Sequence, residues 1–163
     1  MTDRQEIDEL FSMFHDFEII KLTYHDNILN LTIQIPWGQM WNDLDYFIRV
    51  ELTGCDFIIC DYAEVLNTPE NLAKRWGEQS HIDKSSNDQQ LISNIGLEVQ
   101  RHEFYPPNKY KFLCNSSKNT QYGGGHLTFT ADNYKIYNKE GIQIDLYQME
   151  KWCREWWDNI QKT

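Results

Sequence analysis

The sequence predicts an α+β fold: a mainly antiparallel sheet of about seven to nine strands, with a short amino-terminal helix and a carboxyl-terminal helix packed on the sheet. Three observations predict this class. Residues 14–35 hold a clear period-2 alternation, several shorter alternating runs follow it, and residues 146–160 hold an apolar stripe of helical period. Short links between the runs favour antiparallel pairing, because parallel strands need long crossover connections. An open sheet and a partly closed barrel are both compatible with this pattern.

The first 35 residues are expected to form a helix followed by a β-hairpin. Thr2 can cap the helix, which ends near His15 and gathers its apolar side chains on one face: Ile7, Leu10, Phe11 and Phe14. The second arm of the hairpin alternates between apolar and polar residues, with Leu29, Leu31, Ile33 and Ile35 on the apolar side. The first arm contributes Ile20, Leu22 and Tyr24, and polar residues 25–27 make the turn.

Shorter alternating runs predict further strands along the rest of the chain. They cover residues 46–53, 57–66, 95–105, 110–114, 127–131, 134–137 and 142–144. Thr68 and Pro69 begin a short helix that is expected to end at Trp76. Residues 78–90 are rich in Ser, Asn and Asp and are expected to be a mobile loop, while the glycines at 123–125 are expected to form a turn.

The carboxyl-terminal helix has the strongest helical pattern of the chain. Its apolar residues recur at spacings of three and four: Leu146, Met149, Cys153, Trp156 and Ile160. Asp145 with Gln148 forms a capping box at its start, and Trp152 and Trp157 widen the stripe. We therefore expect this helix to lie across an open face of the sheet.

Length and composition favour a single domain over residues 1–163. A hydrophobic content of 40%, with 14% aromatic residues, is ample for a packed interior. No apolar run approaches the roughly 20 residues needed to span a bilayer, and acidic residues stand where a signal peptide needs basic ones. These features predict a cytoplasmic protein that does not bind a membrane. Its four cysteines are widely spaced, without a CxxC pair, so reduced thiols are expected.

The net charge is concentrated in the first part of the chain. Residues 1–66 contain 13 Asp and Glu against 3 Lys and Arg, whereas residues 67–163 contain 12 of each. A nucleic-acid surface would need the opposite sign, so nucleic acid is disfavoured as a partner. Acidity on one section of a domain can attract a basic protein partner, and the alternative is that it only keeps the protein soluble.

Two His-Asp pairs are the candidates for chemistry. His15-Asp16 and His25-Asp26 could hold a metal or act in acid-base catalysis, as in a metal-dependent hydrolase. The alternative is that they cap a strand and form a turn. No phosphate-binding loop and no GxSxG motif is present. The sequence therefore favours a protein that is not an enzyme, and no cofactor is expected.

The best candidate for a binding surface is the segment between the second and third predicted strands. This segment holds two aromatic anchors, Trp37 and Trp41, and a flexible apolar one, Met40. Asp43 and Asp45 add acidic groups beside them. Acids of the adjoining strands, Glu51 and Asp56, would extend this surface. The alternative is that both Trp side chains fold back and close one end of the core.

Four stretches carry a family resemblance. These are a short amino-terminal helix, a His-Asp pair that opens a strand (FHDFEIIKLTY), the alternating strand that follows (ILNLTIQI) and a Trp-rich carboxyl-terminal helix (WCREWW). Together they resemble small uncharacterised bacterial α+β domains. Some of these are similar to immunity proteins of polymorphic toxin systems. The resemblance implies a cytoplasmic protein that binds a toxin domain.

Three functions are therefore considered. A protein-binding module of the immunity type is favoured. The alternatives are a small-ligand-binding domain that uses an aromatic-lined sheet face, and a hydrolase that uses the His-Asp pairs. No oligomeric state follows from the sequence.

Overall fold

The computed structural model describes residues 3–43, 45–75, 77–116 and 120–162. They form α1 (Asp3–Ser12), β1 (Phe17–His25), β2 (Ile28–Gln34), the 3₁₀ helix η1 (Pro36–Trp41), β3 (Phe47–Thr53), β4 (Ile58–Val65), α2 (Pro69–Leu72), β5 (His81–Ser86), α3 (Gln89–Ile95), β6 (Leu97–Tyr105), β7 (Lys109–Ser116), β8 (Tyr122–Thr130), β9 (Asn133–Tyr137), β10 (Gln143–Ile144) and α4 (Leu146–Gln161). The predicted capping residue Thr2 lies outside the described residues.

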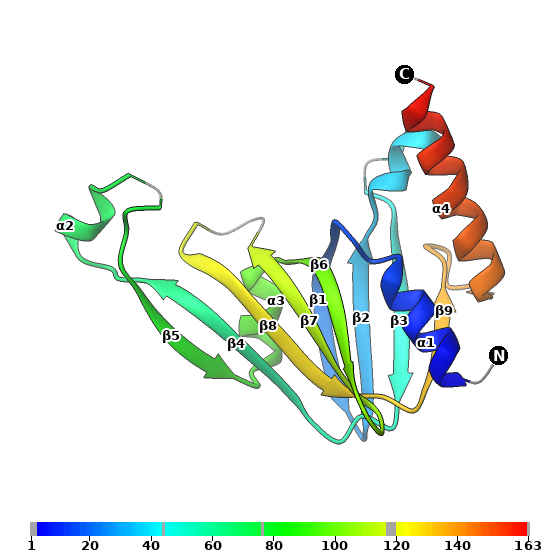
Figure 1. The fold of residues 1–163 in the computed structure, drawn as a ribbon, viewed down its shortest axis with the longest axis horizontal. Coiled ribbons are helices and arrows are strands. Elements are labelled where there is room, and N and C mark those ends of the chain that lie inside the picture. Colours follow the sequence, from blue (N-terminus) through cyan, green and yellow to red (C-terminus); the bar gives the residue numbers. More distant parts are fainter. Residues whose placement is uncertain (1–2, 44, 76, 117–119, 163) are drawn as a thin grey trace.

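The strands form one open antiparallel sheet in the order β10-β9-β3-β2-β1-β6-β7-β8-β4-β5 (Figure 1). This confirms the predicted α+β class, with ten strands where seven to nine were expected. Figure 1 shows that β4, β5 and α2 extend away from the other strands, while α1 and α4 lie near the opposite end of the sheet. Among the described residues, none of the helices has the length and apolar character needed to cross a membrane.

A short junction joins the two halves of this sheet. β1 pairs with β6 only where Phe17, Glu18 and Ile19 face Val99, Glu98 and Leu97. Beyond Ile19, α3 takes the place that β6 would occupy beside β1. The Leu22 N–H donates to Ser93 Oγ at 2.9 Å, and Gln89 exchanges two hydrogen bonds with the main chain of Tyr24. The helix side chains thus satisfy a strand edge that would otherwise have unpaired polar groups.

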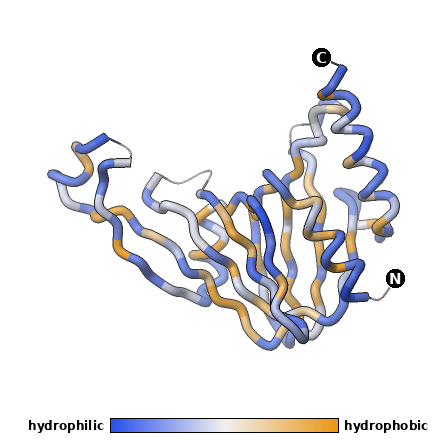
Figure 2. The backbone as a smooth tube through the Cα atoms, viewed as in Figure 1, coloured by the Kyte–Doolittle hydropathy of each residue, from blue (hydrophilic) through white to orange (hydrophobic). Residues whose placement is uncertain are grey.

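α1 covers the apolar face of the sheet. Phe11 is 1% exposed, and its ring lies 4.8 Å from Phe112, 5.1 Å from Tyr110 and 5.8 Å from Phe129. These contacts are edge-to-face, a favourable arrangement for aromatic rings. Figure 2 shows that hydrophobic residues concentrate along the central strands and that α4 and β5 are mostly hydrophilic. The centre of the core therefore lies between α1 and strands β6, β7 and β8.

The first strand differs from the predicted alternation at one residue. The register between β1 and β2 shifts between Ile19 and Lys21, which leaves Ile20 as an extra residue. As a result Phe17, Ile19 and Leu22 are buried, while Ile20 is half-buried. A β-bulge of this kind cannot be recognised from a strict period of two.

The carboxyl-terminal helix begins as predicted, since the Asp145 side chain accepts a hydrogen bond from the Gln148 N–H at 2.8 Å. Only Leu146 and Met149, in its first turn, are buried. The helix contacts η1 and α1 and covers one end of the core. The predicted packing of this helix is thus seen in its first turn, where Leu146 and Met149 join the hydrophobic core, while its outer turns extend beyond the fully buried residues.

Three local predictions are corrected. The helix from Pro69 is capped by Thr68 as expected but ends at Leu72, and Trp76 lies outside the described residues. Residues 78–90 contain strand β5 and the start of α3, where a loop was predicted. Residues 123–125 lie inside β8, where a turn was predicted. Glycine is needed in this strand because Gly124 has φ 89° and because a Cβ at Gly125 would overlap the main-chain oxygen of Asp61.

All four cysteines are free. Burial raises the pKa of Cys55 to about 11 and the pKa of Cys60 to about 12, and it also raises the pKa of Cys114. Cys153 is half-buried and its pKa is raised for the same reason. The reactive form of a thiol is the thiolate, which these shifts suppress.

We predict that Phe11→Ala lowers the free energy of unfolding by about 3 to 5 kcal/mol, because it leaves a cavity surrounded by aromatic rings. Denaturant unfolding followed by circular dichroism measures this loss. Tyr147, which is 70% exposed, supplies the control. Tyr147→Ala should stay within about 0.5 kcal/mol of the parent protein. Equal effects of the two substitutions would contradict the placement of α1.

We also predict that at most one thiol, that of Cys153, reacts promptly with an aromatic disulfide reagent at pH 8 in the folded protein. All four should react in guanidinium chloride, because unfolding removes the burial that raises their pKa values. The release of the coloured thiolate counts the reacting groups. Prompt reaction of two or more thiols before unfolding would show that the core is more open than the structure indicates.

Candidate functional site

The predicted partner-facing segment forms η1 and the turn after it, and its first tryptophan belongs to the core. Trp37 is 1% exposed and its ring lies 5.2 Å from Phe17 in an edge-to-face contact. Its indole is therefore not available to a partner in this conformation. For Trp37 the alternative interpretation, closure of one end of the core, describes the structure.

The second tryptophan lies on the surface and joins η1 to α4. Trp41 is 38% exposed, and its ring lies 4.7 Å from Tyr46 and 5.5 Å from Trp152 of α4. Beside it, the half-buried Met40 accepts a hydrogen bond through its sulfur from the Asn159 side chain at 3.3 Å. The two anchors at residues 40 and 41 thus lie against the carboxyl-terminal helix.

The apolar stripe of α4 continues beyond the core. Its first members, Leu146 and Met149, are buried, whereas Trp152, Cys153 and Trp156 are half-buried. Trp157 is then 50% exposed and Ile160 42% exposed. We call the surface formed by these outer residues and η1 the aromatic patch; it consists of Met40, Trp41, Trp152, Trp156, Trp157 and Ile160.

Sequence reasoning found only the η1 half of the aromatic patch. The Trp residues of α4 were visible as the WCREWW stretch, but the helical stripe was interpreted as a surface packed on the sheet. A helix of 16 residues is about 24 Å long. Full burial ends after the first turn, Trp152, Cys153 and Trp156 pack against the core only in part, and Trp157 and Ile160 are exposed, so the outer part of the stripe reaches the surface.

The acids predicted to extend this surface are divided among three places. Asp43 lies near the aromatic patch and binds Lys139 at 2.6 Å, and this hydrogen bond lowers the pKa of its carboxyl group. Asp45 is exposed beside it. Glu51 lies between Arg49 and Lys135 on the polar face of the sheet. Asp56 follows β3, at the end opposite Asp45, and seven strand residues separate them by about 23 Å or more. Glu51 and Asp56 are therefore not part of the aromatic patch.

The two His-Asp pairs lie at opposite ends of β1. His15 contacts Asp16 at 3.5 Å and His25 contacts Asp26 at 3.1 Å, but nine strand residues separate the pairs by about 30 Å. Both Asp residues have positive φ, at 66° and 50°, as in turns. The structure thus does not bring the four side chains together. Within the described ranges, no three His, Cys, Asp or Glu side chains gather in a way that could hold a metal ion.

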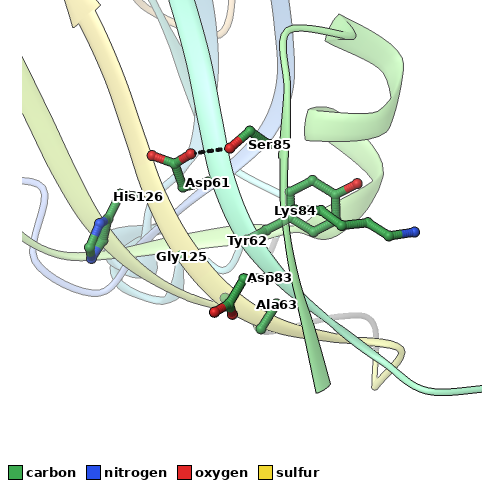
Figure 3. A pocket seen from close by; sticks show the side chains of 9 residues that line it. Asp61, Tyr62, Ala63, Asp83, Lys84, Ser85, Gly125 and His126 are labelled. Carbon is green, nitrogen blue, oxygen red and sulfur yellow. Dashed lines mark hydrogen bonds between the residues drawn. The ribbon is translucent and has the colours of Figure 1, made fainter.

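A second candidate is a polar hollow on strands β8, β4 and β5, shown in Figure 3. Its volume is about 490 Å³, and Asp61, Asp83, Ser85 and His126 supply its functional groups. Ser85 faces Asp61 on the neighbouring strand, and Asp61 faces His126 on the next. Ser85 donates a hydrogen bond to Asp61 (Figure 3). Sequence reasoning missed this hollow, because only the strand register brings residues 61, 85 and 126 into one row.

The order of this row excludes a hydrolase triad. In a triad the histidine contacts the serine, and the acid holds the far side of the histidine. Here Asp61 lies between Ser85 and His126, which are two strand spacings, or about 10 Å, apart. His126 therefore cannot take the proton of Ser85. The hollow can hold a polar group by hydrogen bonds, but it does not assemble an activated nucleophile.

The aromatic-lined sheet face is not open to a ligand. Tyr110, Phe112 and Phe129 lie on it, and each is no more than 1% exposed because Phe11 of α1 covers them. A small molecule could reach these rings only if α1 moved away. The structure therefore offers no support for the small-ligand alternative in the form that the sequence suggested.

Comparisons of this chain with protein-family models, with curated proteins and with solved structures find no match.

Proposed function

We propose that this protein is a non-enzymatic protein-binding module and that the aromatic patch is its main binding surface. The observation that carries the proposal is the continuation of the α4 stripe past the end of the core. Trp41, Trp157 and Ile160 are each more than a third exposed. The ring of Trp41 lies 5.5 Å from the half-buried ring of Trp152, and Trp156, Trp157 and Ile160 follow Trp152 along the same helix.

Such a surface has the composition of an interface centre. Tryptophan is the residue type most enriched among residues that dominate binding energy, and methionine adapts its shape to a partner. Exposed tryptophan side chains that already rest against neighbours lose little conformational freedom on binding. The patch therefore favours association with another protein.

The proposed partner is a toxin domain, as the resemblance to immunity proteins implies, and the proposed location is the cytoplasm. A basic toxin surface would complement the net charge of −10. Asp45 and the Asp43–Lys139 pair lie beside the aromatic patch, where they can orient an approaching cation. The acids would mainly speed association, while the Trp side chains would slow dissociation.

The first test uses the protein encoded by the neighbouring gene, expressed as its carboxyl-terminal domain. We predict that Trp41→Ala and Trp157→Ala each weaken its binding by about 30-fold or more, the loss typical of a hot-spot residue. Biolayer interferometry measures the change, which should be mainly in the dissociation rate. Circular dichroism checks that each variant remains folded.

Tyr147→Ala is the matched control. Tyr147 is also an exposed aromatic residue of α4, but it lies outside the apolar stripe. This control should bind within about threefold of the parent protein. Unchanged binding by both Trp variants, or an equal loss with Tyr147→Ala, would exclude the aromatic patch. Absence of binding to the neighbouring gene product would refute the toxin assignment.

A further inference from the structure

A second feature, independent of the aromatic patch, is the uncovered outer edge of β5. The sheet has two terminal strands, and β10 at one end has only two residues. The open part of β1 is covered by Gln89 and Ser93 of α3. β5 has six residues, five of them exposed, and it ends the sheet on the other side (Figure 1). A strand edge of this kind is a template for pairing with another strand.

The hydrogen-bonding groups on this edge can be assigned. The Leu66 N–H donates to the Ser80 oxygen at 3.0 Å, whereas the Val65 N–H donates to Gln121 on the other side of β4. Since antiparallel strands alternate their bonding direction, Ile82 and Lys84 direct their main-chain groups toward β4. His81, Asp83 and Ser85 then direct theirs outward. The edge offers three N–H donors and three carbonyl acceptors.

The side chains of β5 are divided between two faces. His81, Asp83 and Ser85 lie on the face of the polar hollow, and Ile82 and Lys84 lie on the other. Ile82 is 47% exposed. A second strand beside β5 would thus be selected by charge on one face and by an apolar contact on the other.

A second copy of β5 meets these requirements when the pairing is centred on Ile82. A two-fold axis perpendicular to the sheet keeps each face on its own side, so one residue must lie opposite itself. Centring on Asp83 or Lys84 would place like charges opposite each other, which is unfavourable. Centring on Ile82 places the two Ile82 side chains opposite each other. It also pairs each His81 with Asp83 of the second copy. The main-chain N–H and C=O groups that both residues direct outward from the edge then face each other.

We propose that β5 pairs with β5 of a second copy in the register centred on Ile82, forming a symmetric dimer with a continuous sheet of twenty strands. In this register His81, Ile82 and Asp83 of each β5 pair with the other β5. Three paired residues from each copy make a small interface, so the dimer is weak and depends on concentration. β5 and α4 lie at opposite ends of the molecule (Figure 1). Dimerisation therefore leaves both aromatic patches accessible and gives a partner two equivalent binding sites.

Sedimentation equilibrium of the full chain tests dimerisation without any partner. The weight-average mass should rise above 19.6 kDa as the concentration increases toward the millimolar range. His81→Asp places like charges opposite each other twice and should weaken the dimer about tenfold. His81→Lys keeps the attraction to Asp83 and should not weaken it. A mass of 19.6 kDa at every concentration would overturn the proposal.

Single cysteine substitutions test the register. In the proposed pairing, Ile82 and its copy form a pair without mutual hydrogen bonds, with Cα atoms about 4.5 Å apart, which a disulfide can bridge. Under mild oxidation Ile82→Cys should form most of the covalent dimer. The parent protein, Asp83→Cys and Lys84→Cys should form at least fivefold less. The parent is a valid control because three of its four cysteines are buried.

Each other outcome of this cross-linking assay contradicts the proposal. Preferential cross-linking of Lys84→Cys or Asp83→Cys would indicate a different register. Equal cross-linking of all three variants would indicate random collision. If Ile82→Cys stays monomeric while the parent protein sediments as a dimer, the two copies associate through another surface, such as the aromatic patch.

Discussion

Three residue pairs between β1 and β6 hold the two halves of the sheet together, and most other features depend on this junction. Beyond it the two strands separate, and Gln89 and Ser93 of α3 bond the main chain of β1 in place of β6. The His15-Asp16 pair lengthens the junction: Asp16 donates its N–H to the Val99 oxygen and His15 contacts the Gln100 oxygen, both at 2.8 Å. This pair therefore acts at the junction and not as half of a metal site.

The junction is supported at the far end of the strands by the two segments that cross between the halves. The Asp56 N–H donates to the Thr130 hydroxyl at 2.8 Å, and that hydroxyl donates to the Gly54 oxygen at 3.2 Å. The Asp132 N–H donates to the Thr53 oxygen. Hydrogen bonds thus join the link between β3 and β4 to the end of β8 and the link between β8 and β9. Asp56, which the sequence indicated as part of a binding surface, takes part in these hydrogen bonds through its main-chain N–H.

The parts of the fold that follow from local patterns could be predicted from the sequence. The arm from Leu29 to Ile35 alternates strictly, and its apolar residues are all buried. The Asp145 cap is local chemistry and was also found. β5 was missed because a terminal strand with both faces exposed has no apolar period to display. The polar hollow was missed because its residues lie on three strands, and their register is set by long-range pairing.

The distribution of charge shows how a pattern along the chain can mislead about the surface. The excess acid of residues 1–66 is contiguous in sequence, but the structure spreads it over α1, the polar sheet face, the η1 turn and the β3–β4 link. Glu51 and Asp43 already have cationic neighbours, Lys135 and Lys139, that belong to the later part of the chain. A basic partner would therefore be attracted by the field of the whole molecule, which weakens with salt. Charge of this kind can raise the rate of encounter with many cationic proteins. Discrimination among them has to come from a surface with a defined shape, and in the function proposed above the Trp side chains of the aromatic patch supply it.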